Sequence, residues 1–320
     1  MPEKGKITMP DISIVAPCYN EIENIVTTFE ALTNVIRPMN LTYEILFVDN
    51  GGTDGQLEVM KRIYEQFPNV VRVVSLSRNF GYQMSISAGL EYAEGKAVIV
   101  VDADLQDPPE LIKVFIEKWH EGFDVVYGIR VKRQGSFILK IFYKLFYWIF
   151  NKTADIPIPR NSGEFGLMSR RVVNEIKTMP EKVRFIRGLR AWTGFNQIGI
   201  PYTRLRRSGG ESKFRIFDNL VLALDGILSF STRILTGMSI VGFLITLLSV
   251  ILLVYVVGWK LFIGTFVPGY AALMVTISFF SGVIILMLGV IGACIERIFL
   301  EVKNRPKFIV RETLGIEREK

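Results

Sequence analysis

The segment VIVVDADLQD at residues 98–107 decides the fold class of this chain of 320 residues. Its first half is apolar and β-branched, which is typical of a strand buried on both faces. Asp102, Asp104 and Asp107 then follow within six positions. Acids so close together repel one another unless a cation lies among them, and Mg²⁺ or Mn²⁺ takes oxygen ligands. The segment predicts a metal site for a phosphorylated substrate at the carboxyl edge of an α/β sheet, where such folds bind ligands.

An acidic turn is the alternative, because Asp is common where a helix begins and Pro108-Pro109 follow directly. Around this segment the chain alternates expected strands with expected helices. The strands are expected at 12–16, 43–49, 70–76, 97–101 and 124–127, and the helices at 21–36, from Gly55 to about 67, and at 84–93. Such alternation predicts a doubly wound, mostly parallel sheet.

Two uncharged stretches predict transmembrane helices at residues 234–257 and 271–295. About 20 apolar residues are enough to cross a bilayer, and the alternative is a buried helical hairpin. Basic residues are concentrated before the first stretch and after the second, whereas the connecting loop holds only Lys260. By the positive-inside rule, we expect a multi-pass protein of the plasma (inner) membrane with both termini and the catalytic domain in the cytoplasm.

Two further segments are expected at the membrane surface. Residues 137–150 (FILKIFYKLFYWIF) span roughly 21 Å as a helix, too short for a bilayer, and their lysines share one face. A core helix is the alternative there. Residues 216–233 form a second amphipathic candidate next to the first span. The predicted organisation is a catalytic domain at 1–215, this juxtamembrane helix, the two spans and a basic cytoplasmic tail at 296–320.

Composition narrows the function classes. The net charge of +7 suits phosphorylated substrates and anionic lipids, and the two spans favour a bilayer rather than nucleic acid as partner. His120 is the only histidine, so a histidine-based triad or metal site is disfavoured. Cys18 and Cys294 lie in different regions, which makes a disulfide or cysteine-based metal site improbable.

Four ordered motifs carry a resemblance to a known family. They are APCYNE (16–21), VDNGGTDG (48–55), RNFG (78–81) and DADLQDPP (102–109). This set resembles the family 2, GT-A-type glycosyltransferases, which use nucleotide-sugar donors. VYGIR (126–130), NSGEF (161–165) and RSGGESKF (207–214) are similar to the polyprenyl-phosphate branch, which includes dolichyl-phosphate mannose synthase and bactoprenol glucosyltransferases. The two spans make the bacterial bactoprenol type the closer match.

The resemblance implies a donor site and a metal site. The implied donor-binding residues are Pro17, Tyr19, Asn20, Glu21, Val48, Asp49, Arg78, Gly81, Gln83, Asp102, Ala103 and Asp104. Asp104 is expected as the first ligand of Mg²⁺ or Mn²⁺, with Gln106 as its neutral partner. Asp102 is a further expected metal ligand and is directed toward the ribose and sugar. The cation would bridge the diphosphate of the donor. Asp49 has an alternative role as a turn residue, and Arg78 as an exposed charge.

The implied acceptor is a polyprenyl phosphate, undecaprenyl phosphate in bacteria. Its second pKa is about 6, so its phosphate is largely a dianion and already nucleophilic. The residues expected to bind this phosphate are Arg130, Arg133, Arg160, Ser162 and Arg206. The residues expected to act in catalysis are Asp104, Glu164, Arg130, Arg207 and Lys213. The family usually has Asp where this chain has Glu164, and a displacement of about 1 Å can cost about a hundredfold in rate.

The implied reaction is inverting transfer of a hexose, with UDP-glucose as the first candidate donor. GDP-mannose, a UDP-N-acetylhexosamine and a UDP-aminoarabinose type stay open, as does a non-catalytic membrane scaffold with a decayed transferase domain. A processive polysaccharide synthase is disfavoured because the chain has no Arg-Trp pair and only two predicted spans. A dinucleotide oxidoreductase would need a Gly-rich turn after the first strand. Self-association into a homo-oligomer is a further hypothesis.

Overall fold

The computed structural model describes residues 9–131, 162–204 and 269–316, together with a few separate positions between 242 and 262. Several predictions concern residues outside these ranges. They are the interfacial helix at 137–150, the juxtamembrane helix at 216–233, nearly all of the first span at 234–257, and the side chains of Arg133, Arg160, Arg206, Arg207 and Lys213.

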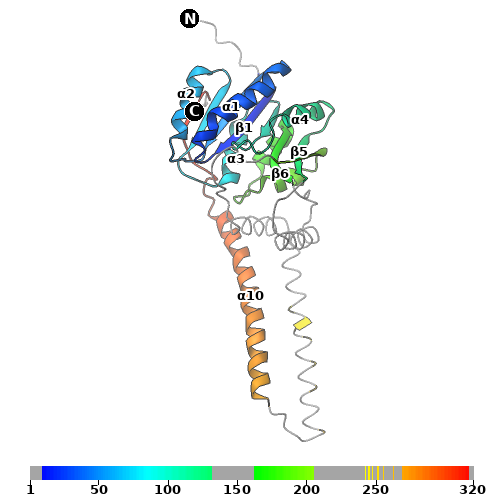
Figure 1. Cartoon of the computed structure of the whole chain (residues 1–320). Helices are drawn as coiled ribbons and strands as arrows, with labels where there is room; N and C mark the ends of the chain where they lie inside the picture. Colours follow the sequence, from blue (N-terminus) through cyan, green and yellow to red (C-terminus); the bar gives the residue numbers. More distant parts are fainter. Residues whose placement is uncertain are drawn as a thin grey trace.

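A central sheet has the strand order β7-β5-β6-β4-β1-β2-β3-β8 (Figure 1). The strands are β1 (Ile12–Cys18), β2 (Tyr43–Asp49), β3 (Val71–Leu76), β4 (Ala97–Val100), β5 (Val125–Arg130), β6 (Ser162–Ser169), β7 (Gln197–Tyr202) and β8 (Val310–Leu314). The central strands β4-β1-β2-β3 run parallel. By contrast, β6 is antiparallel to both of its neighbours, and β8 is antiparallel to β3. The α/β class is confirmed, and the sheet is mixed.

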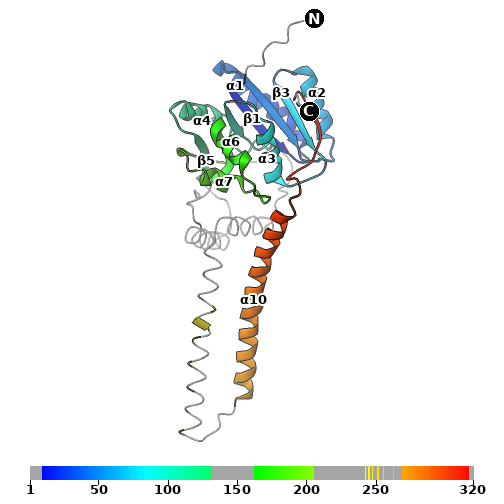
Figure 2. The same cartoon turned by 180° about the vertical axis from the view of Figure 1, so that it is seen from behind.

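Helices cover both faces of this sheet (Figure 2). The helices α1 (Ile22–Ile36), α2 (Gln56–Gln66) and α4 (Leu111–His120) lie over one face, and the short 3₁₀ helix η1 (Arg37–Met39) follows α1. The opposite face is covered by α3 (Tyr82–Tyr92), α6 (Arg170–Thr178) and α7 (Ile186–Trp192).

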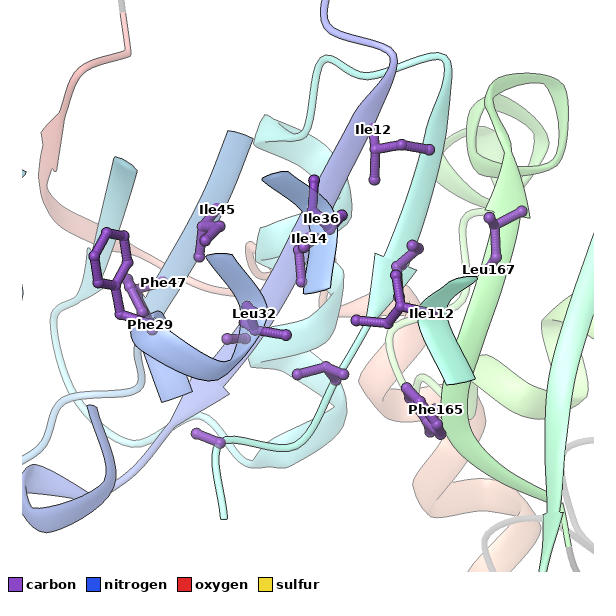
Figure 3. Close-up of a cluster of buried hydrophobic side chains, with 14 of the residues drawn as sticks. Ile12, Ile14, Phe29, Leu32, Ile36, Ile45, Phe47, Ile112, Phe165 and Leu167 are labelled. Carbon is purple, nitrogen blue, oxygen red and sulfur yellow. The ribbon is translucent and has the colours of Figure 1, made fainter. Parts of the chain in front are cut away.

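The core divides between the two faces because successive strand residues point to opposite sides. Ile14 of β1 belongs to the cluster with Phe29 and Leu32 of α1, and Phe165 of β6 lies in that same cluster (Figure 3). Val15, the next residue of β1, belongs to the other cluster. Every residue of β1 is buried. A strand covered on both faces needs apolar side chains on both, so such strands are recognised in the sequence as nearly continuous apolar runs.

The helix α10 (Tyr270–Val302) extends away from the α/β domain (Figure 1). Its segment Phe279–Val302 contains an 18-residue window with a mean hydropathy of 2.4 and is long and apolar enough to cross a membrane. Among the described residues it is the one helix that meets these criteria of length and composition. The second predicted span, 271–295, lies inside α10, whereas the two-span prediction as a whole rests partly on residues outside the described ranges.

The segment predicted as a basic tail, 296–320, contains regular structure: its first residues complete α10. The chain after α10 then returns to the α/β domain, where β8 pairs with the edge strand β3. Glu312 of β8 forms an ion pair with Lys61 of α2 at 3.1 Å. The alternating pattern of Val310–Leu314 is short, and its pairing partner lies far away in sequence. This strand therefore covers an edge that would otherwise expose unpaired backbone groups.

Candidate active site

The sheet topology brings the predicted motifs to one edge. The parallel strands β1 to β4 end at the same edge, where Cys18 lies opposite Asp49 and Asp49 opposite Ser75. Because β6 runs antiparallel to β4, with Gly166 opposite Val100, the start of β6 lies at this carboxyl edge too. The ends of β5 and β7 lie there as well, since these two strands are parallel to each other and β5 is antiparallel to β6.

The carboxylate of Asp49, predicted to bind the donor, accepts hydrogen bonds from the protein itself. Its side chain is fully buried, and Oδ1 accepts hydrogen bonds from the backbone N–H of Gly52 at 2.9 Å and from Gln56 at 2.5 Å. Oδ2 accepts a hydrogen bond from the Ser75 hydroxyl at 2.7 Å. Both oxygens are thus engaged with the protein, which favours the turn role for Asp49 over direct contact with the nucleotide.

The loops that follow β1 and β2, both predicted to bind the nucleotide-sugar donor, are hydrogen-bonded to each other. Asn20 adopts a left-handed conformation with φ of 53°, and its side-chain oxygen accepts from the backbone N–H of Thr53 at 2.8 Å. The backbone N–H of Glu21 donates to Gln56 at 2.9 Å. Tyr19 is 37% exposed beside them, whereas Pro17 and Val48 are paired and buried within the sheet. Of this group, Tyr19 is the side chain most accessible to a nucleotide.

The loop that follows β3, also predicted to bind the nucleotide-sugar donor, is held in place by the amide side chains of Asn50 and Asn79. Asn50 donates to Asn79 at 3.1 Å and accepts from the backbone N–H of Phe80 at 3.0 Å. Asn79 in turn accepts from the backbone N–H of Gly81 at 2.8 Å. The guanidinium of Arg78 lies over the Phe80 ring, 4.1 Å from its centroid. These contacts hold Arg78 and Gly81 at the rim of the edge, where the sequence predicts the nucleotide.

The acidic segment surrounds a guanidinium group. Asp102 Oδ2 lies 3.1 Å from Nη2 of Arg204, and Asp104 Oδ2 lies 3.9 Å from the same nitrogen. Asp107 Oδ1 lies 3.2 Å from Nε of Arg204. The Tyr82 hydroxyl also donates to Asp102. The three acids predicted to attract a cation are therefore brought together, and the cation among them is a side chain from just beyond β7.

The loop geometry of this segment keeps its carboxylates at the strand end. Leu105 adopts a positive φ of 53°, and Asp104 Oδ1 accepts from the backbone N–H of Gln106 at 3.1 Å. The Ala103 carbonyl accepts from the Thr28 hydroxyl at 2.8 Å. In the described part of the chain, no three His, Cys, Asp or Glu side chains form a ready metal-binding group. The oxygen donors for a metal are present, but Arg204 engages them.

Asp107 is the most buried acid of the cluster. Its side chain is fully buried and accepts from the Tyr202 hydroxyl at 2.6 Å. Nε of Arg130 donates to the same hydroxyl at 3.1 Å, and Nη2 of Arg130 lies 3.6 Å from Asp107 Oδ2. Arg130, predicted to bind the acceptor phosphate, is thereby anchored beside the acidic segment. Because Asp107 is fully buried and contacts Tyr202 and Arg130, we assign it a structural role in the site.

Electrostatics at this edge favour a cation. Burial and the neighbouring carboxylates of Asp107 and Asp104 raise the pKa of Asp102 to about 7. Burial and the nearby acids raise the pKa of Tyr82, so its hydroxyl stays protonated and can donate to Asp102. A positive charge placed among these acids would favour their ionised forms.

Glu164 occupies a buried position in a second charged group. Its Oε1 accepts from the side-chain amide of Gln83 at 3.0 Å and lies 3.4 Å from Nε of Arg187. Gln83 also accepts from the backbone N–H of Ile186 at 2.8 Å, so one amide links α3, β6 and α7. The other carboxylate oxygen of Glu164 makes no hydrogen bond within the described residues. Ser162, two residues earlier, is buried, and its carbonyl accepts from Arg187 at 3.1 Å.

Several site residues were missed by sequence reasoning. Asp107 was recognised as part of the acidic segment but was not assigned to the site, and Arg204 was counted only as a basic residue near the membrane. Tyr82, Arg187 and Tyr202 were not singled out. Tyr82 adjoins the RNFG motif, which is the one local signal that could have drawn attention to it.

Comparison with known proteins assigns this arrangement to a family. The Glycosyl transferase family 2 profile matches residues 13–177, about half of the chain, including the strand-end loops and the start of β6. The chain belongs to glycosyltransferase family 2. The predicted family membership is therefore confirmed, and the profile covers the acidic segment and Glu164, whereas Arg187, Tyr202 and Arg204 lie beyond its end.

Relatives match this family 2 glycosyltransferase over nearly its whole length. An uncharacterized glycosyltransferase, sll0501, of Synechocystis sp. is 44% identical over 96% of both chains. The SfII prophage-derived bactoprenol glucosyl transferase of Shigella flexneri is 38% identical over 94% of this chain and 98% of that protein. Among solved structures, the mannosyltransferase PcManGT from Pyrobaculum calidifontis, in complex with GDP-Man and Mn²⁺, has a TM-score of 0.45 and 20% identity over 64% of this chain and 59% of that one. That likeness is too low to add to the assignment.

Proposed function

We propose that this family 2 glycosyltransferase transfers a hexose from a nucleotide sugar to the phosphate of a membrane polyprenyl phosphate. UDP-glucose is the first candidate donor and undecaprenyl phosphate the first candidate acceptor. The observation that carries this proposal is the 38% identity to a bactoprenol glucosyl transferase over 94% of this chain. The match includes the C-terminal third, which the family profile ending at residue 177 does not cover.

The chemistry of the edge supports a reaction between two anionic substrates. The charged groups around the acidic segment and the start of β6 include the acids Asp102, Asp104, Asp107 and Glu164 and the arginines Arg130, Arg187, Arg190 and Arg204. Arginine suits bidentate contact with phosphate oxygens. The opposite charges let one edge hold both a cation and two phosphorylated groups.

A divalent cation fits the donor set of the acidic segment. Asp104 and Asp102 would hold Mg²⁺ or Mn²⁺ through carboxylate oxygens, with Gln106 as a neutral partner. The fit rests on this structure, since a positively charged guanidinium is drawn to the same oxygens. When bound, such an ion neutralises charge that develops on a departing nucleoside diphosphate.

A phosphate acceptor does not require a strong general base from the protein. Its phosphate is largely dianionic at neutral pH and can attack the anomeric carbon directly, which inverts its configuration. Arg130 lies at this edge to bind that phosphate, and Arg133, Arg160, Arg206, Arg207 and Lys213 remain proposed partners. We assign Glu164 an orienting role, because Gln83 and Arg187 hold one of its carboxylate oxygens.

The helix α10 supports catalysis at a membrane surface. Its apolar length suits a bilayer, and its C-terminal end contacts the catalytic domain, where Glu301 accepts from the backbone N–H of Lys182 at 2.7 Å. We propose that α10 and the predicted first span anchor the enzyme in the plasma membrane, with the catalytic edge on the cytoplasmic side. A lipid-linked acceptor would then reach the edge without leaving the bilayer.

A transfer assay tests the reaction. The full chain, purified in detergent, is incubated with undecaprenyl phosphate, Mg²⁺ or Mn²⁺ and a panel of radiolabelled nucleotide sugars, and label is counted in the organic phase. We expect label from one donor, abolished by EDTA and by Asp104→Asn. The exposed Glu58→Gln on α2 serves as a matched control that keeps wild-type labelling. A folded wild-type protein that labels no lipid from any donor would contradict the proposal.

The same assay separates the alternatives. A non-catalytic scaffold would neither transfer the sugar nor hydrolyse the donor in the presence of metal. Another donor specificity would label the lipid from GDP-mannose or a different UDP-sugar while keeping the requirement for Asp104.

A further inference from the structure

Arg204 contacts the carboxylates that are predicted to hold a metal ion. One of its nitrogens lies 3.1 Å from Asp102 and 3.9 Å from Asp104, and another lies 3.2 Å from Asp107. The contacts bridge 102 positions of sequence between Arg204 and Asp102. A single guanidinium thus serves as the common counter-ion of the three acids in the predicted metal-binding segment.

A divalent ion and this guanidinium exclude each other. Ligand oxygens approach Mg²⁺ at about 2.0–2.1 Å and larger divalent ions at up to about 2.6 Å. An ion bound to the nearer oxygens of Asp102 and Asp104 would compete with Nη2 of Arg204 for those oxygens, and its charge would repel the guanidinium. The Arg204 side chain is 29% exposed and follows the end of β7, so part of it already faces solvent.

The acids need a counter-ion when no metal is bound. Asp107 is fully buried, and the side chains of Asp102 and Asp104 are 21% and 14% exposed. Carboxylates so close together and so shielded from water are unfavourable without a positive charge. Arg130 reaches Asp107 only, so among the described arginines Arg204 is the one that contacts all three acids.

We propose that Arg204 is an exchangeable counter-ion, which neutralises the acidic segment in the free enzyme and must leave before the divalent ion and nucleotide sugar bind. The exchange rests on the proposed metal-dependent function.

Direct titration of Mn²⁺ tests the exchange without any turnover. The full chain in detergent is titrated with Mn²⁺ alone, and free Mn²⁺ is measured by electron paramagnetic resonance. If the guanidinium occupies the acids about nine-tenths of the time, Arg204→Gln tightens Mn²⁺ binding about tenfold. Arg204→Lys keeps the positive charge but loses the forked geometry of the guanidinium. Its affinity for Mn²⁺ is expected to lie between those of the wild type and Arg204→Gln. Arg204→Lys also replaces Arg204→Gln as the test if that variant does not fold.

Arg130→Gln is the matched control. It removes one positive charge from the same cluster, yet Arg130 contacts Asp107 and Tyr202 and forms no ion pair with Asp102 or Asp104. Removal of a positive charge alone would strengthen Mn²⁺ binding modestly in both variants. Loss of a direct competitor for the oxygens should make the effect of Arg204→Gln at least about threefold larger than that of Arg130→Gln. Equal tightening, no tightening or an absence of Mn²⁺ binding would each overturn the exchange.

The lipid-labelling assay keeps the two proposals distinguishable. Wild-type labelling without the selective Arg204 effect would leave the transferase function standing and remove the exchange. The selective effect without labelling would support the exchange and overturn the proposed reaction.

Discussion

The hydroxyl of Tyr202 is expected to stabilise the catalytic edge measurably, and Tyr202→Phe tests this. The hydroxyl donates to Asp107 at 2.6 Å, and the Asp107 side chain is fully buried. Burial and the negative charge of Asp107 raise the pKa of Tyr202, so it remains a donor throughout the neutral range. The aromatic ring is expected to stay in place, because its edge-to-face contact with Phe165 involves only ring atoms that the substituted phenylalanine keeps. The two ring centroids lie 5.9 Å apart.

The magnitude follows from one lost hydrogen bond to a buried charge. Such bonds contribute about 1.5–3 kcal/mol, and no cavity is created because the ring is unchanged. We therefore expect Tyr202→Phe to lower the free energy of unfolding by about 2 kcal/mol. For a domain of about 200 residues this corresponds to a fall in Tm of about 4–8 °C. Arg130 also loses its hydroxyl acceptor, which weakens the alignment of a predicted acceptor-binding residue.

The assay is thermal unfolding of the purified chain in detergent, followed by circular dichroism. Tyr127→Phe is the matched control, because Tyr127 is buried in the adjacent strand β5 and its hydroxyl makes no hydrogen bond within the described residues. The control should shift Tm by less than about 2 °C, since it removes a hydroxyl without breaking a hydrogen bond within the described residues and leaves the ring in place. Equal shifts for the two variants would refute the reasoning that Asp107 depends on Tyr202.

Three further predictions concern other parts of the molecule. Glu164→Asp should lower kcat/KM for lipid labelling about a hundredfold, because the shorter side chain withdraws the carboxylate from Gln83 and Arg187; unchanged or faster transfer would remove the orienting role. Gly89→Ala should destabilise the fold by about 1–3 kcal/mol in denaturant unfolding, since the added Cβ would lie 2.1 Å from a methyl of buried Val15, and a neutral result would show that α3 can shift. Burial and nearby cations lower the pKa of Lys307 to about 8. Between about pH 8 and 10 the unfolded chain therefore binds more protons at Lys307 than the folded chain does. The free energy of unfolding of the wild type, relative to that of Lys307→Met, should rise with pH over this window. A difference that does not change with pH would contradict this prediction.

The first half of the fold could be predicted because its strands are buried on both faces. Such strands appear as apolar runs, and β1 to β4 lie within a residue or two of their predicted ranges. The strands β6 and β8 could not be predicted in the same way. The sequence of β6, SGEFGLMS, is rich in small and polar residues, and its antiparallel place beside β4 depends on contacts distant in sequence.

The same distinction separates the predicted from the missed parts of the site. The acids Asp102 and Asp104 form a local pattern and could be recognised as candidate ligands. Their partners are set only by the sheet order, since Tyr202 lies 95 positions from Asp107 and Gln83 lies 81 positions from Glu164. No periodicity or spacing rule connects positions so far apart, so the counter-ions of the cluster had to come from the structure.

Asp49 and Asp102 show why similar sequence contexts lead to different chemistry. Both follow an apolar strand and lie at the same edge, but Asp49 is surrounded by neutral donors that satisfy both of its oxygens. Asp102 has two further acids within five positions, which add negative charge and no donor hydrogens. Its segment therefore needs a mobile or exchangeable positive charge, whereas the Asp49 loop is complete by itself. Replacing Asp49 should thus disturb the loop and its stability, while replacing Asp102 or Asp104 should change the affinity of the edge for cations.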